Sequence, residues 1–159
     1  MAFDGLFTKK MVEELSFLEG GRIHKINQPD NDTIIMVIRQ NRKNHSLLLS
    51  IHSNFSRMHI TKKKYDNPFE PPMFNRVFRK HLDGGIIQAI RQIDNDRRIE
   101  IDVQSTDELG DKIYRTVILE IMGKHSNLIL VDDNRKIIEG FIHLTPNTNQ
   151  YRTVLPGFQ

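Results

Sequence analysis

Cysteine is absent from this chain of 159 residues, and its absence removes several kinds of chemistry. No disulfide can form, no zinc site can use thiolate ligands, and no thiol nucleophile is available. No apolar run approaches the roughly 18 residues of a membrane-spanning helix, and no signal-peptide pattern opens the chain. We therefore expect a cytoplasmic protein. Export to the cell surface by a non-classical route is the alternative.

Common catalytic and nucleotide-binding motifs are missing as well. No G-x-S-x-G segment exposes a serine, and neither G-x-x-x-x-G-K-[ST] nor G-x-G-x-x-G is present to cradle phosphates. Ser126 follows His125, but adjacent side chains on a strand point to opposite faces and cannot act as nucleophile and base. The seven histidines form no i, i+4 helical pair typical of metal ligation. We expect no enzyme activity, no metal and no cofactor.

Composition favours a single domain. Hydrophobic residues make up 38% of the chain and charged residues 27%, which is ordinary for one globular core. Residues 1–159 are therefore expected to form one domain. Within it, residues 144–159 read as an extended tail or the start of a linker to further parts of a longer protein.

Positive charge is concentrated in one part of the sequence. The net charge is +3, but residues 21–64 hold nine basic and two acidic residues, a local +7. Such a region can attract a polyanion such as RNA, and the alternative is a solvated basic face without a partner. The candidate phosphate contacts are Arg22, Lys25, Arg42, Lys43, Lys62, Lys63 and Lys64.

The spacing of apolar residues predicts two helices and many short strands. Helices are expected at 5–19 and 73–82, each followed by a Gly-Gly pair. Alternating or short apolar runs predict strands at 22–27, 33–39, 46–51, 57–61, 86–93, 98–104, 114–121, 126–131 and 137–141. No internal repeat is visible. Short strands and two helices in one core imply an α+β fold, mainly an antiparallel β-sandwich.

Two polar segments between predicted strands are richer than a turn needs. Asp96-Arg97 forms either a local ion pair or a guanidinium that its carboxylate neighbour orients toward a phosphate or base. Residues 120–127 form either an ordinary hairpin or an RNA-contacting loop. In such a loop Glu120 accepts from base amino groups, Met122 lies against an unstacked base and Lys124 meets phosphate.

These segments also carry a resemblance to a known family. The matching residues, in the family's order, are 2–5, 20–29, Asp96-Arg97, 120–133 and 151–157. They resemble the N-terminal domain of the NFACT family over essentially the whole chain. The resemblance implies that tRNA is contacted by Asp96, Arg97, Glu120, Ile121 and Met122.

The resemblance also implies a function for the full-length protein. Family members bind large ribosomal subunits obstructed by peptidyl-tRNA, recruit tRNA-Ala and promote C-terminal alanine tailing of the stalled chain. The domain would then bind tRNA and ribosome, while the ribosome performs the chemistry. The alternative is an adhesin that binds fibronectin, as an older family name implies.

The resemblance implies a fold similar to the N-terminal domain of formamidopyrimidine-DNA glycosylases. Those enzymes attack with an N-terminal proline amine beside a glutamate. Ala2 and Phe3 stand at these positions here, so a glycosylase mechanism has no nucleophile.

Overall fold

Nine antiparallel strands and two helices form the described part of the computed structural model, which covers residues 5–30, 32–51, 57–62, 73–93, 98–121 and 126–140. The helical segments are α1 (Gly5–Leu15), the short 3-10 turn η1 (Ser16–Leu18) and α2 (Met73–Leu82). The strands are β1 (Arg22–Asp30), β2 (Thr33–Gln40), β3 (Lys43–Ser50), β4 (Arg57–Thr61), β5 (Ile86–Gln92), β6 (Arg98–Thr106), β7 (Lys112–Glu120), β8 (Asn127–Asp132) and β9 (Ile137–Gly140). Every predicted helix and strand is present, with shifted ends. The predicted tail at 144–159 lies outside the described residues.

Two turns are tighter than the sequence pattern indicated. β1 continues to Asp30, three residues beyond the predicted end at residue 27. β3 begins at Lys43, so that only Asn41 and Arg42 separate it from β2. Both turn residues have positive φ, 53° and 65°, the pattern of a type I′ hairpin, whose twist matches that of the flanking strands.

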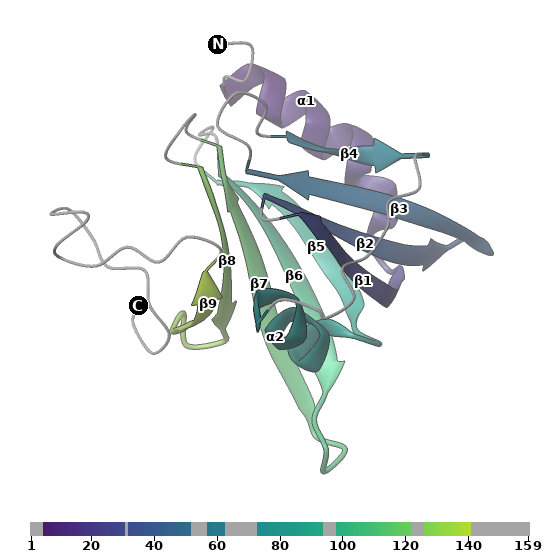
Figure 1. Ribbon diagram of the computed structural model, residues 1–159. Helices are drawn as coiled ribbons and strands as arrows, with labels where there is room; N and C mark the ends of the chain where they lie inside the picture. The colour runs from purple at the N-terminus through teal and green to yellow at the C-terminus, as the bar shows by residue number, and fades with distance from the viewer. Residues whose placement is uncertain are drawn as a thin grey trace, which may run out of the picture.

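Hydrogen bonding joins all nine strands into one sheet, in the order β4-β3-β2-β1-β5-β6-β7-β8-β9. The predicted α+β class with mainly antiparallel strands is confirmed. The sandwich is corrected to one continuous sheet that bends between β1 and β5, so that β2–β4 run across the direction of β6–β8 (Figure 1). Among the described residues β1 and β5 share one ladder pair, Arg22 with Ile86, and this short junction permits the bend.

One face of the bent sheet carries the main hydrophobic core. Strands from both halves and both helices contribute to it. Leu15 and Leu18 anchor the first helical segment, and Phe78 and Leu82 anchor α2. Among the described helices, none has the length and apolar character to cross a membrane.

The two halves of the sheet repeat one another, which the sequence pattern had not revealed. In each half a helix leads through a leucine and a Gly-Gly pair into four antiparallel strands with the same register. Each half also has a one-residue irregularity at the same place in its first strand. Corresponding residues include Leu18 and Leu82, Gly21 and Gly85, Ile23 and Ile87, Ile35 and Glu100, and Ile51 and Ile121. Because isoleucine, leucine, valine and methionine replace one another at core positions, the repeat leaves little trace in residue identity.

Reciprocal backbone hydrogen bonds close the seam between the halves. Four of them run from Gly20 N to Ile87 O (2.7 Å), Gly84 N to Ile23 O (2.7 Å), Ile23 N to Gly85 O (2.8 Å) and Ile87 N to Gly21 O (2.9 Å). The pattern places equivalent backbone groups of the two halves opposite each other. The seam is therefore a local pseudo-twofold contact.

Close packing requires glycine at the seam. A Cβ atom on Gly21 would lie 2.6 Å from Ile38 Cγ2, and one on Gly85 would lie 2.5 Å from Val103 Cγ1. Both distances are shorter than any ordinary carbon–carbon contact. A larger residue would push the first and second strands of its half apart.

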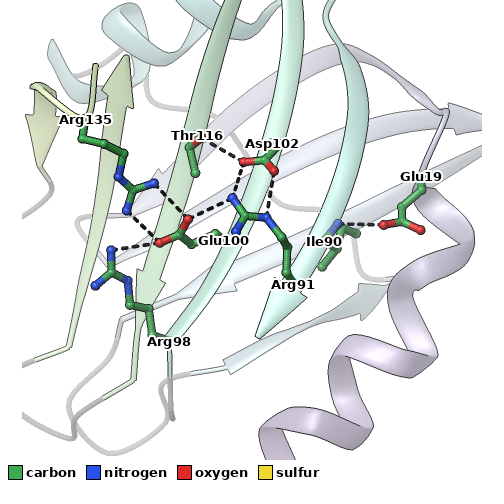
Figure 2. Close-up of polar contacts among 8 residues, drawn as sticks. All are labelled: Glu19, Ile90, Arg91, Arg98, Glu100, Asp102, Thr116 and Arg135. Carbon is green, nitrogen blue, oxygen red and sulfur yellow. Dashed lines mark hydrogen bonds and ion pairs between the residues drawn. The ribbon is translucent and has the colours of Figure 1, made fainter. Parts of the chain in front are cut away.

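Charged side chains satisfy backbone groups where the strands diverge from the seam. The Ile90 N–H of β5 donates to the Glu19 carboxylate at 2.9 Å (Figure 2). On the other side, Arg79 of α2 donates to Ile26 O at 2.9 Å. Ile26 and Ile90 are equivalent residues of the two halves. A longer ladder between β1 and β5 would have paired their backbone groups, and here a charged side chain near a helix end makes the hydrogen bond instead.

We expect Gly85→Ala to destabilise the domain by about 1–3 kcal/mol, the usual cost of overpacking. The matched control is Gly84→Asn. The added Cβ of Gly84 would meet no atom within 4 Å, and asparagine tolerates positive φ best after glycine. Chemical denaturation of the two variants checks this. Equal losses of stability would contradict a steric origin.

Candidate nucleic-acid interface

Strand ends bring together the two polar segments that the sequence singled out. Arg98 at the start of β6 pairs with Glu120 at the end of β7, and Glu120 pairs with Asn127 at the start of β8. Ile93 N donates to Arg98 O at 3.0 Å, which ties the end of β5 to the same place. Neighbouring strands lie about 4.8 Å apart. The chain therefore enters and leaves both segments at one end of the sheet, at the upper left of Figure 1.

We call this the loop end and define it by the described residues Ile93, Arg98, Glu120, Ile121, Ser126 and Asn127. The remaining predicted tRNA contacts, Asp96, Arg97, Met122 and Lys124, lie outside the described residues. The described residues that flank the two segments nevertheless lie at one common end of the sheet.

Glu120 and Ile121 differ in their surroundings. Ile121 is 1% exposed and packs in the main core, as does its counterpart Ile51 in the first half. The Glu120 side chain lies on the opposite face of the sheet, the face of its cross-strand neighbour Arg98, and the residue is 7% exposed. Of these two predicted tRNA contacts, Ile121 is therefore a core residue and Glu120 is a largely buried carboxylate.

The described basic candidates are exposed but belong to the other half of the sheet. Arg22, Lys25, Arg42, Lys43 and Lys62 are all exposed. Strand register puts most of them at one end of β1–β4, since Arg22 pairs with Arg39, Arg39 with Asn44 and Thr61 with Ser46. We call this end of the sheet, with the exposed residues Arg22, Arg42, Lys43 and Lys62, the basic end. The seam separates its strands from those of the loop end, and Lys63 and Lys64 lie outside the described residues.

Arg42 occupies a costly backbone conformation at the basic end. Its φ of 65° is the left-handed region, which costs an ordinary L-residue roughly 1–2 kcal/mol. Type I′ turns favour glycine at this position. Strain of this kind is often retained where a side chain has a function.

A charged cluster on the outer face of β5, β6 and β7 was not predicted from the sequence. Figure 2 shows three arginines converging on Glu100, whose side chain is 3% exposed. Arg135 donates from its two terminal nitrogens to both carboxylate oxygens at 3.0 and 2.9 Å. Arg91 reaches Oε1 at 3.1 Å, and Arg98 reaches Oε2 at 2.9 Å. We call these four residues, with Asp102, the arginine cluster.

Asp102 completes the cluster. Arg91 donates to its two oxygens at 2.8 and 2.9 Å, and the Thr116 hydroxyl donates to Oδ1 at 2.9 Å. Burial raises the pKa of Asp102, but the Arg91 and Thr116 hydrogen bonds and the nearby positive charges outweigh it, so the pKa lies below its ordinary value. Asp102 is therefore held as a carboxylate.

The same balance applies to Glu100. Burial is the largest single influence on its pKa and raises it. The Arg135 hydrogen bonds and the charges of Arg135, Arg98 and Arg91 together outweigh burial and lower the pKa below its ordinary value. The buried carboxylate is thus ionised and fully engaged with guanidinium groups.

Part of this cluster could have been recognised in the sequence. Arg98, Glu100 and Asp102 alternate along β6 and must share one face. Arg135 gives no such signal, because it comes from the β8–β9 turn and has a φ of 66°. Across the ranges that the structure covers, no three His, Asp or Glu side chains are grouped to hold a metal ion.

Replacing Arg42 by glycine should stabilise the domain. Relief of roughly 1–2 kcal/mol of strain outweighs the roughly 0.4–1 kcal/mol of extra backbone entropy in the unfolded chain. Lys43→Gly, at the next position but within β3, should destabilise by about 0.5–1 kcal/mol. Denaturant midpoints measure both changes. A loss of stability in both variants would argue against strain at Arg42.

Glu100 should contribute to the acid sensitivity of the fold. Since its pKa is lower in the folded state than its ordinary 4.5, its stabilising contribution is complete above that pH and is lost as pH falls through the folded-state pKa. Thermal midpoints between pH 7 and 3 should therefore fall more for the wild type than for Glu100→Gln. Glu108→Gln, at an exposed hairpin position, is the control and should follow the wild type. Parallel curves for wild type and Glu100→Gln would contradict the assignment.

Comparison with known proteins places this chain in a family. Residues 4–159 match the family model described as NFACT N-terminal and middle domains. The chain is 53% identical to a protein named Rqc2 homolog RqcH from Streptococcus suis (strain 05ZYH33), over 99% of this chain and 29% of that protein. It is 50% identical to the protein of the same name from Bacillus subtilis (strain 168), over 99% and 28%. The chain thus spans less than a third of these curated relatives.

Solved structures are also similar. The fibrinogen binding protein from Staphylococcus aureus has a TM-score of 0.90 and 73% identity, over 99% of this chain and 55% of that one. The N-terminal domain of fibronectin-binding protein PavA from Streptococcus pneumoniae has a TM-score of 0.95 and 48% identity, over 99% and 60%. The chain belongs to the NFACT family, and it lies within the part that comprises the N-terminal and middle domains.

Proposed function

We propose that this chain is the tRNA- and ribosome-binding module of a ribosome-associated quality-control factor. In the full-length protein it would help recruit tRNA-Ala to large ribosomal subunits obstructed by a stalled chain, for C-terminal alanine tailing. The observation that carries the proposal is about 50% identity, over 99% of the chain, to proteins named RqcH. A cytoplasmic location is part of the same proposal.

The loop end supports this function physically. RNA that is read in loops has splayed bases, which proteins bind by stacking on side chains such as arginine and by hydrogen bonds to the base edges. The segments with Asp96-Arg97 and Met122–Lys124 begin and end on neighbouring strands, so one RNA loop could meet both. We assign no catalytic residue, and the peptide-bond chemistry is left to the ribosome.

Within this site we give Ile121 an anchoring role in place of a tRNA contact. Its side chain is buried in the core at the point where the second segment begins. Packing there fixes the place at which the segment begins. Glu120, on the opposite face beside Arg98, would accept from the RNA only at its small exposed fraction.

Fibronectin binding is the second candidate, because a solved relative carries that name. An extended fibronectin segment could add to a free sheet edge. In the part of the chain that the structure describes, the edge strands are β4, with five residues, and β9, with four. Such short edges offer few backbone hydrogen bonds, so we rank this function below RNA binding.

The test is to compare the full-length wild type with the double variant Asp96→Ala, Arg97→Ala. We expect the variant to keep its melting temperature, because the sequence predicts a polar turn at this pair and substitutions in exposed turns usually alter stability by no more than about 0.5 kcal/mol. It should no longer co-purify tRNA from cytosol or support alanine tailing. Unchanged tailing would refute the role of this pair. Salt-insensitive fibronectin binding without co-purified tRNA would favour the adhesin.

A further inference from the structure

We infer that the arginine cluster is a second RNA-binding surface, a preorganised platform of guanidinium groups that contacts backbone phosphates next to the loop end. The inference rests on the proposed RNA-binding function and extends it to residues outside the family's recognised segments. Glu100 acts in it as a positioning residue, which holds the guanidinium groups of Arg91, Arg98 and Arg135 and does not itself contact RNA.

The geometry leaves guanidinium surface available. The side chains of Arg91, Arg98 and Arg135 remain 44%, 35% and 46% exposed, while the Glu100 side chain beneath them is 3% exposed. Three positive charges face two negative ones, Glu100 and Asp102. An approaching phosphate would therefore meet a positive, donor-rich surface above the buried carboxylate.

Arg98 connects the arginine cluster to the loop end. Its terminal nitrogen contacts Glu100 at 2.9 Å, and its side chain remains 35% exposed. Arg98 directly follows the segment that contains Asp96-Arg97 and pairs with Glu120 across the loop end. The cluster is therefore continuous with the proposed tRNA site.

The internal repeat shows that the same arrangement of strands forms without this cluster. The residue equivalent to Glu100 in the first half is Ile35, which is 4% exposed. Val37 occupies the position equivalent to Asp102, and Asn27 that equivalent to Arg91. The same scaffold thus forms with neutral residues at these three positions. Buried ion networks seldom stabilise a protein better than apolar residues of similar size, so stability alone does not explain why this network is present.

Backbone strain at Arg135 points the same way. Arg135 has a φ of 66°, a conformation that suits glycine or asparagine. The turn is held by Asp132, which accepts from the backbone N–H groups of Asn134, Arg135 and Lys136. An arginine kept in a strained position, with both ends of its guanidinium on one carboxylate, indicates selection for the guanidinium itself.

The experiment measures binding of an unmodified tRNA-Ala transcript to the full-length protein over a range of salt concentrations. We expect Arg91→Gln and Arg135→Asn each to weaken binding several-fold and to reduce the slope of log K against log salt by about 1. Arg135→Asn keeps the turn, because asparagine tolerates its φ. Lys112→Gln is the control, since it removes the same charge from the opposite end of β7, and it should leave binding unchanged.

Variants of Glu100 distinguish a positioning role of this residue from an effect of net charge on RNA binding. Glu100→Gln removes one negative charge and so raises the net charge of the cluster by one. Unspecific attraction alone would therefore tighten RNA binding. We expect several-fold weaker binding instead, because the arginines lose their anchor, while Glu108→Gln should bind as the wild type does. Glu100→Ile, which copies Ile35, gives the same test if the glutamine variant does not fold.

The outcomes distinguish the two proposals. If the wild type shows no salt-dependent tRNA binding, the proposed function and this inference both fail. Suppose instead that the wild type binds while Arg91→Gln and Arg135→Asn retain its affinity and slope, or that the folded Glu100 variants bind more tightly. The arginine cluster is then not an RNA surface, and the proposed function stands without it.

Discussion

The close approach of two Gly-Gly segments is the constraint on which the rest of the structure depends. At the seam, equivalent backbone groups of the two halves exchange hydrogen bonds, and the space beside Gly21 and Gly85 is already filled by Ile38 and Val103. Because the seam is short, the sheet can bend there. The bend turns the inner faces of both halves toward one core.

The two halves share apolar residues at core positions and differ at other positions. Inner-face positions are apolar in both halves, so Ile51 and Ile121 are buried alike. The outer faces and strand ends are free to diverge, since they do not affect shared packing. The first half carries Ile35 on its outer face, where the second half carries Glu100, and it also carries the basic end. The second carries the arginine cluster and the loop end.

This division also shows why adjacent residues in one motif have different roles. Along a strand, successive side chains point to opposite faces. In the segment that was predicted to contact tRNA, Ile121 enters the core while Glu120 faces outward beside Arg98. The role of each residue in such a motif therefore depends on which face of the sheet its side chain occupies.

The sequence by itself determined the elements and the family. Apolar periodicity and Gly-Gly stops placed both helices and all nine strands, because these signals are local, and the quoted segments identified NFACT. Tertiary structure alone decided that the strands form one bent sheet, that the halves repeat, and that the residues flanking the two polar segments lie at one end of that sheet. It also decided that Arg135 meets Glu100 from a turn far along the chain. These features depend on pairing between distant residues, which no local pattern encodes.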